Sequence, residues 1–155
     1  MQSMLKGILV VFAAWCFLAS AFAVEKTIAK SDLPPAVQKT AAQQSAGSSV
    51  ISNSKDREGG KLEYEVQMKV NGHSKDVTIA PDGQLLEIEE EVSKSDLSPE
   101  VAAALEQKAG KGKIAKIESL TKNGKIVAYE AQVVTRGKRS EVQVGPRGQT
   151  LSHEE

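Results

Sequence analysis

Three short segments of this chain occur twice at a nearly constant spacing, and this repetition constrains the fold more than any single residue. A Lys-Ser-Asp-Leu segment, a Tyr-Glu-x-Gln segment and a Pro-x-Gly-Gln segment each return 64 or 65 residues later. The copies lie at residues 30–33 and 94–97, 64–67 and 129–132, and 81–84 and 146–149. A repeat of this length is typical of a structural unit that buries its core against a second copy. We therefore expect two tandem repeats.

The first residues have the three parts of a secretory signal peptide. Lys6 supplies a positive charge, residues 8–18 form an apolar core, and the Ala-Phe-Ala sequence at residues 21–23 predicts cleavage before Val24. The apolar run is shorter than the ~20 residues of a membrane-spanning helix, although a retained anchor is the alternative. We expect a signal peptide over residues 1–23, a periplasmic or secreted protein, and no membrane span after cleavage.

Removal of residues 1–23 would leave a chain without cysteine and with only two aromatic residues, Tyr64 and Tyr129. No disulfide could then form, although exported proteins fold in an oxidising compartment. One repeat alone, at about 64 residues, would bury only ~60% of its unfolded surface and be marginally stable. We therefore expect repeats at residues 24–92 and 93–155 to share one sheet in a single two-lobed α+β domain.

Each repeat begins with the signals of a short helix. In the second repeat Ser98 is a suitable N-cap, Pro99 takes the first helical position, and Gly110 is expected to end the helix. The first repeat has Pro34 in place of the serine, and its helix is expected to begin at Pro35 and to end at Gly47.

About four antiparallel strands are expected to follow each helix, because apolar and polar residues alternate between turn signals. The expected strands cover residues 50–55, 62–70, 77–79 and 86–92 in the first repeat, and 114–121, 127–133 and 142–144 in the second. Leu86, Ile88 and Val92 are expected to share one face. The last strand of the second repeat is expected to be truncated after Leu151, and residues 89–92 to be a strand that joins the repeats.

Charge is balanced, with 20 basic and 20 acidic residues, so the chain lacks the basic character of a nucleic-acid-binding protein. Its distribution is uneven: arginines gather on the turns of the second repeat, and an acidic run at residues 87–91 is expected on an edge strand. The candidate partner-binding residues are Arg136, Lys138, Arg139 and Arg147. Solvation of exposed turns is the alternative explanation for this basic group.

No motif for catalysis or for a cofactor stands out. His73 and His153 have no cysteine or matching histidine at metal-ligand spacing. Asp82, Glu87 and Glu89 offer oxygen ligands to a cation, but the second repeat has an arginine in place of the aspartate. Neither a nucleophile elbow nor a phosphate-binding glycine loop is present. We expect no enzyme activity, no cofactor and no metal site.

The sequence resembles the PepSY-like domains, which are related to the fold of the beta-lactamase-inhibitory protein. The resemblance rests on Asp-Leu-Pro-Pro-Ala-Val, a helix and a glycine, followed by Gly-Lys-Leu-Glu-Tyr-Glu-Val and Asp-Gly-Gln-Leu-Leu-Glu-Ile-Glu. It covers nearly all of the chain after the signal peptide, twice over. It implies an exported, non-enzymatic binding module that inhibits or holds a peptidase or another envelope protein. The scarcity of aromatic residues argues against a tight interface built on aromatic anchors.

Two alternatives to this function stay open. The first is a small-ligand or cation-binding periplasmic protein that uses the acidic strand. The second is a self-associating structural protein, in which the acidic edge at residues 87–91 of one copy meets the basic residues 136–139 of another.

Overall fold

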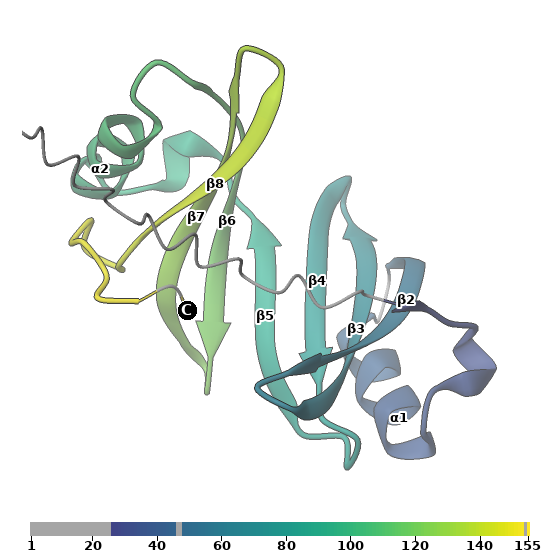
Figure 1. Ribbon diagram of the computed structural model, residues 1–155. Coiled ribbons are helices and arrows are strands. Elements are labelled where there is room, and N and C mark those ends of the chain that lie inside the picture. Colours follow the sequence, from purple (N-terminus) through teal and green to yellow (C-terminus); the bar gives the residue numbers. More distant parts are fainter. Residues whose placement is uncertain (1–25, 46–47, 154) are drawn as a thin grey trace, which may run out of the picture.

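The computed structural model describes residues 26–45, 48–153 and 155, whose strands form one antiparallel sheet (Figure 1). The described strands are β1 (Lys26–Thr27), β2 (Ser49–Glu58), β3 (Lys61–Val70), β4 (His73–Ile79), β5 (Leu85–Glu91), β6 (Lys113–Lys122), β7 (Lys125–Thr135) and β8 (Lys138–Val144). The described helices are η1 (Lys30–Asp32), α1 (Pro35–Gln44), η2 (Lys94–Asp96) and α2 (Pro99–Ala109). The signal peptide expected over residues 1–23 lies outside the described residues.

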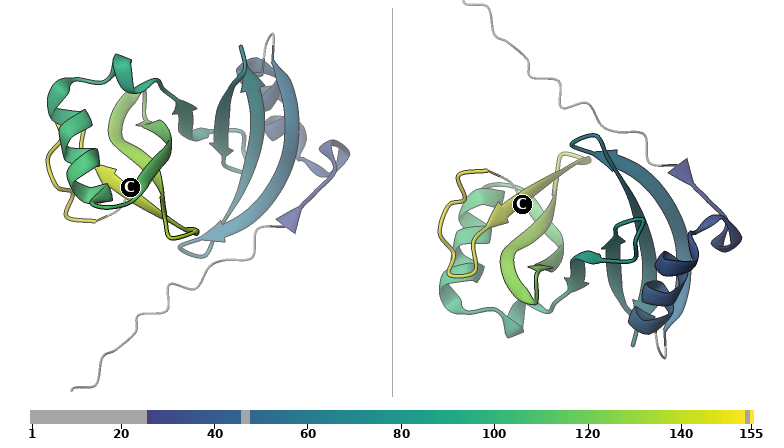
Figure 2. Two further views of the ribbon diagram at one scale, coloured as in Figure 1. Left: turned by 90° about the horizontal axis from the view of Figure 1, so that it is seen from above. Right: turned by 90° about the horizontal axis from the view of Figure 1, so that it is seen from below.

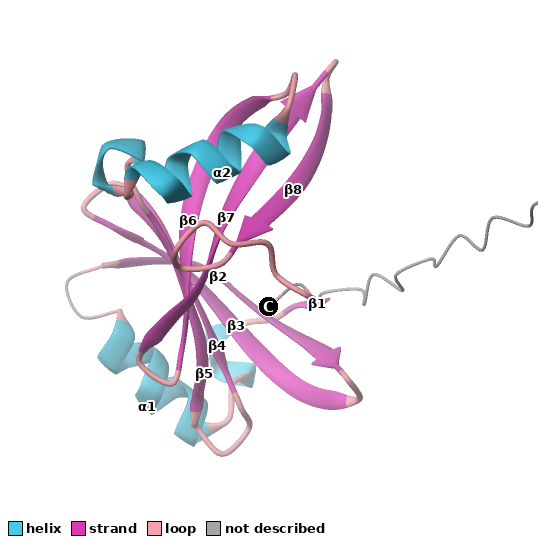
Figure 3. Ribbon diagram, turned by 90° about the vertical axis from the view of Figure 1, so that its left-hand side faces the viewer, coloured by secondary structure: helices cyan, strands magenta, loops and turns pink. Residues whose placement is uncertain are grey.

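The strands follow one another across the sheet in chain order, from β1 at one edge to β8 at the other. In both halves a short 3-10 helix and an α-helix precede the long strands, and the two α-helices lie at opposite ends of the molecule (Figure 2). Figure 3 shows the strands twisting between these helices. No helix in the described part of the chain is long and apolar enough to cross a membrane.

Strand β5 joins the two halves, because it pairs with β4 on one side and β6 on the other. The expectation of a strand that connects the two halves is therefore confirmed. The expectation that residues 87–91 form an acidic edge is wrong, and so is self-association through that edge. The acidic residues indicate that one face of this strand is not covered by a helix. Central strands have such a face as well as edge strands, so the acidic run does not distinguish the two.

The helices begin at the expected prolines. At the start of α2, the Ser98 side-chain oxygen accepts a hydrogen bond from the Val101 N–H at 3.3 Å, and Gly110 follows the last turn. At the start of α1, Pro34 provides no side-chain cap. Helix α1 ends at Gln44, and the glycine expected to end it, Gly47, lies outside the described residues. Helix α2 thus has a stabilising contact that α1 lacks.

Two hydrophobic clusters lie between the helices and the sheet. The first contains Leu33, Val37, Ala41, Tyr64, Val66, Met68, Val77 and Ile79. The second contains Val101, Leu105, Ile117, Ala131, Val133 and Val144. Strand register places both on the same face of the sheet, because Ile88, which packs on the first cluster, is opposite Thr121, four residues from Ile117. The opposite face carries no described helix.

One detail of β5 differs from the expectation that Leu86, Ile88 and Val92 share a face. The register between β4 and β5 shifts between Thr78 and Ile79, so that Leu85 is opposite Ile79. Leu85 consequently takes the inward position expected for Leu86. Ile88 packs on the first cluster and Val92 on the second, both on the same face, so the expectation is confirmed for these two residues. A bulge of this kind reverses the inward and outward positions, and alternation along one strand does not reveal it.

The repeated Pro-x-Gly-Gln turns hold each helix against the end of a strand. Gly148 has a φ of 78°, and a Cβ atom there would lie 2.6 Å from the Glu100 carbonyl oxygen at the start of α2. Gly83 lies in the same way against Ala36 of α1, and its carbonyl accepts a hydrogen bond from the Thr40 hydroxyl at 2.7 Å. Glycine is required at both turns because only it adopts this conformation at such a close approach.

Candidate binding face

The face of the sheet opposite the helices, called here the open face, is predominantly acidic. Side chains directly opposite each other in an antiparallel sheet point to the same face, so the strand register identifies its residues. On β4 to β7, away from the turns, the acidic residues of the open face are Asp76, Glu87, Glu89, Glu91, Glu118 and Glu130. On the same strands, its lysines are Lys116 and Lys122, together with Lys113 and Lys125 at strand ends. A chain with no net charge thus concentrates negative charge on one surface.

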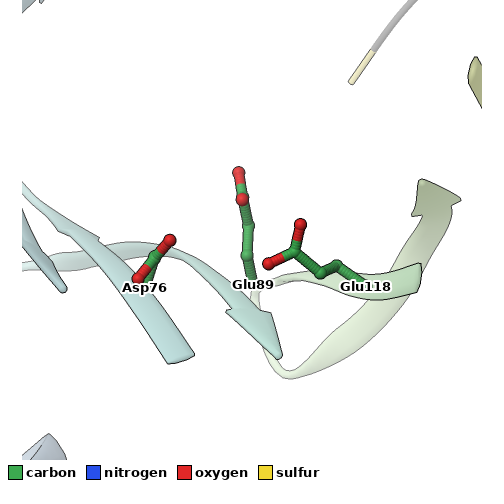
Figure 4. Close-up of side chains that lie close together, drawn as sticks. All are labelled: Asp76, Glu89 and Glu118. Carbon is green, nitrogen blue, oxygen red and sulfur yellow. The ribbon is translucent and has the colours of Figure 1, made fainter. Parts of the chain in front are cut away.

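Three of these carboxylates meet where the two halves of the chain join. Asp76 of β4, Glu89 of β5 and Glu118 of β6 each have a carboxylate oxygen within 4.8 Å of the others (Figure 4). Glu118 is buried, with 3% of its surface exposed. It accepts hydrogen bonds from the Lys116 ammonium at 2.6 Å and from the Ser74 hydroxyl at 3.3 Å. We call these three residues the acidic cluster.

The surroundings of Glu89 favour its neutral form. Burial, a hydrogen bond with Glu87, and the charges of Glu87, Glu118 and Glu130 raise the pKa of Glu89 to about 9. Burial disfavours the charge of Lys116, but the hydrogen bond and charge of Glu118 outweigh it and raise the pKa of Lys116. At neutral pH the acidic cluster therefore holds a proton on Glu89.

A groove of about 480 Å³ opens beside the acidic cluster on the open face. Its lining residues are Glu58, Glu63, Thr78, Gln84, Leu86, Glu87, Glu89, Lys122, Asn123 and Glu155. The Lys122 ammonium lies 3.0 Å from the Glu87 carboxylate and 3.8 Å from that of Glu155. The groove thus has four glutamates near a single lysine, in addition to Glu155. Such a surface attracts positively charged groups.

A larger hollow of about 650 Å³ lies on the helix side of the second half, between the end of α2 and β6. Its lining combines apolar residues with an ion pair between Lys94 and Glu106. Because the charges at its rim already neutralise each other, this hollow has no excess of one charge to select a ligand.

The four basic residues singled out from the sequence are all exposed. Arg136 lies in the turn between β7 and β8, Lys138 and Arg139 begin β8, and Arg147 lies in the turn after it. Between them β8 carries the exposed Glu141 and then buried residues, so Arg147 is separated from the other three along the strand. Their role in partner binding stays a prediction.

The structure brings together only part of the oxygen-ligand set considered from the sequence. Glu87 and Glu89 are hydrogen-bonded to each other, whereas Asp82 accepts a hydrogen bond from the Gln84 N–H within its own turn at 2.9 Å. Asp76 and Glu118 were not predicted to be site residues. Each is an acidic residue in a strand whose apolar and polar residues otherwise alternate, and this was the only indication in the sequence. The pairing of β4 with β5 and of β5 with β6 places both beside Glu89.

Comparisons with known proteins identify the fold. No model of a known protein family matches this sequence, and no curated protein matches it. Solved structures of three Bacteroides proteins are similar. A DUF2874 family protein from Bacteroides ovatus ATCC 8483 has a TM-score of 0.59 at 20% identity, over 78% of this chain and 86% of that chain.

The other two structures agree with this result. A proposed periplasmic protein from Bacteroides eggerthii DSM 20697 has a TM-score of 0.62 at 14% identity, over 76% of this chain and 85% of that one. A BLIP-like protein from Bacteroides fragilis NCTC 9343 has a TM-score of 0.55 at 17% identity, over 77% of this chain and 83% of that chain. At these identities the likeness concerns the fold alone, and it shows that this chain has a BLIP-like α+β fold.

Proposed function

We propose that this protein is a periplasmic, non-enzymatic binding module that holds a positively charged segment of another envelope protein on its open face. The observation that carries this proposal is the concentration of carboxylates on a face of the sheet that no described helix covers. The expected signal peptide supports the location, and so does the likeness to a proposed periplasmic protein from Bacteroides eggerthii.

The arrangement of the acidic cluster supports a role in binding. Like charges on neighbouring strands destabilise a sheet, and burial of a carboxylate adds a further energetic cost. Glu89 avoids this cost only by keeping its proton. A lysine or arginine from a partner would let the carboxylates ionise, because an opposite charge nearby favours the charged form. The face is therefore unfavourable in isolation and is improved by a cationic ligand.

The two halves of the fold support a PepSY-like module present in two copies. Each half begins with the same Lys-Ser-Asp-Leu segment, places a proline-started helix over the sheet, and contains a turn glycine against the first turn of that helix. We infer a signal peptide at residues 1–23 and repeats at residues 24–92 and 93–155. The acidic cluster would then lie at the junction of the repeats, on a surface that neither repeat could form alone.

A divalent cation is the second candidate ligand for the open face. Carboxylate oxygens are the ligands that calcium prefers, and the acidic cluster supplies three carboxylates close together. Lys116 competes with a cation, because its ammonium already binds Glu118. An increase in melting temperature on addition of calcium, lost in Asp76→Asn, would favour this alternative over a protein partner.

The test uses paired variants of residues 24–155 with equal loss of charge. Glu63→Gln with Glu87→Gln removes two charges from the groove, and Glu90→Gln with Glu106→Gln removes two from exposed positions elsewhere. A lysine-rich peptide is the probe, and envelope extract then supplies the natural partner. We expect the groove variant to slow association and to weaken its dependence on salt, since electrostatic steering is screened by ions. Equal behaviour of both variants, or no binding by the wild type, would refute the proposal.

A further inference from the structure

Strand β8 has an edge that no described strand covers. It is the last strand of the sheet and pairs only with β7 among the described residues. Its counterpart in the first half is β4, which pairs on both sides. Val77 of β4 is completely buried and lies opposite Ile88 of β5, whereas Val142, at the equivalent position of β8, is half-buried. The position that β5 occupies beside β4 is therefore vacant beside β8.

The described residues that follow β8 do not fill this position. Residues 150–153 form no strand, and the Glu155 N–H donates a hydrogen bond to the Gln143 side chain at 2.9 Å. The Glu155 carboxylate lies 3.8 Å from Lys122, so this segment turns toward the open face. His153 stands where the first half has Ile88, so the equivalent position after β8 has a polar side chain in place of an apolar one.

The free edge of β8 is complementary in charge to a second copy of itself. Arg139 and Glu141 are both exposed and lie two residues apart, on the same face of the strand. A hollow of about 350 Å³ lies against them, lined by Gln132, Arg139, Ser140 and Glu141. If two β8 strands pair in antiparallel fashion about Ser140, Arg139 of each copy lies opposite Glu141 of the other. Opposite charges in such cross-strand pairs are stabilising.

We propose that two copies of this chain associate through antiparallel pairing of β8 with β8, centred on Ser140, so that their sheets become continuous. The interface is symmetric, as a two-fold dimer requires. It satisfies the backbone groups that an edge strand leaves open. The pairing involves the basic start of β8 but not the groove, so it is independent of the proposed cationic partner.

The test measures the oligomeric state of residues 24–155 by sedimentation velocity over a series of protein concentrations. We expect a dimer for the wild type, and association weakened about tenfold or more by Arg139→Glu or by Glu141→Arg, because each change places like charges opposite each other twice. The double charge swap Arg139→Glu with Glu141→Arg should restore the dimer. Arg136→Glu, in the turn outside the paired segment, is the control and should leave the dimer intact.

Two outcomes would overturn this proposal. A wild-type protein that is monomeric at every concentration would show that the edge stays free or receives a strand from another protein. A dimer that survives both single charge reversals, or a double swap that fails to restore it, would place the interface elsewhere. Circular dichroism of each variant separates loss of association from loss of folding.

Discussion

The buried carboxyl of Glu89 leads to the sharpest test of the structure. Its pKa is raised by burial, by the hydrogen bond with Glu87 and by nearby carboxylates, to about 9 in the folded protein from an ordinary value of 4.5. As the pH increases, the unfolded chain therefore loses this proton long before the folded protein does. The stability that Glu89 contributes is fully present below about pH 4.5 and is lost as the pH rises toward 9.

The size of the effect follows from proton linkage. Between the two pKa values unfolding releases one proton, so stability falls by about 1.4 kcal/mol for each unit of pH. From about pH 5 to about pH 7 the loss amounts to roughly 2–3 kcal/mol. The titration of Glu91 does not alter this decline of stability with pH. The Ser74 backbone N–H lowers the pKa of Glu91, so its own contribution is lost only in more acidic solution.

The perturbation is Glu89→Gln, which keeps the shape of the protonated carboxyl and cannot ionise. Urea unfolding followed by circular dichroism, at intervals between about pH 5 and about pH 8, gives the free energy of unfolding of both proteins. We expect the variant to lose the decline and to be more stable than the wild type by ~3 kcal/mol near pH 7. Glu90→Gln, an exposed neighbour paired with Lys75, should retain the wild-type decline. Parallel pH profiles for the wild type and Glu89→Gln would refute the reasoning.

Two further predictions concern the framework of the fold. Tyr64→Ala should destabilise the protein by about 3 kcal/mol or more, and Tyr129→Ala by less, because Tyr64 is buried and Tyr129 is half-buried. Equal shifts of the urea midpoint would contradict this difference. Gly148→Ala should cost at least ~1 kcal/mol more than Gly137→Ala, since both have a φ of 78° but only at Gly148 would a Cβ atom meet backbone. Equal losses of stability for the two variants in thermal unfolding would show that the backbone around Gly148 can move to accommodate the added Cβ atom.

The sequence by itself determined the features that depend on neighbouring residues. Prolines started both helices where expected, Ser98 capped the second, and glycines marked the turns. Alternation along β3 identified Tyr64 and Met68 as core residues because the two faces of a strand differ in polarity over a few residues. These features are local, so one segment of sequence contains all the information that they need.

Only the tertiary structure decided which strands became neighbours. Glu87 and Glu89 form an acidic run in either an edge or a central strand, and pairing of β5 with β6 made the strand central. The pairing of β5 with β6 also brought Glu118 to Glu89, and the pairing of β4 with β5 brought Asp76 there. Strand register is set by contacts between distant segments, and the pKa of a carboxyl is set by whatever those contacts place around it. For that reason the acidic residues could be read from the sequence, whereas their burial together could not.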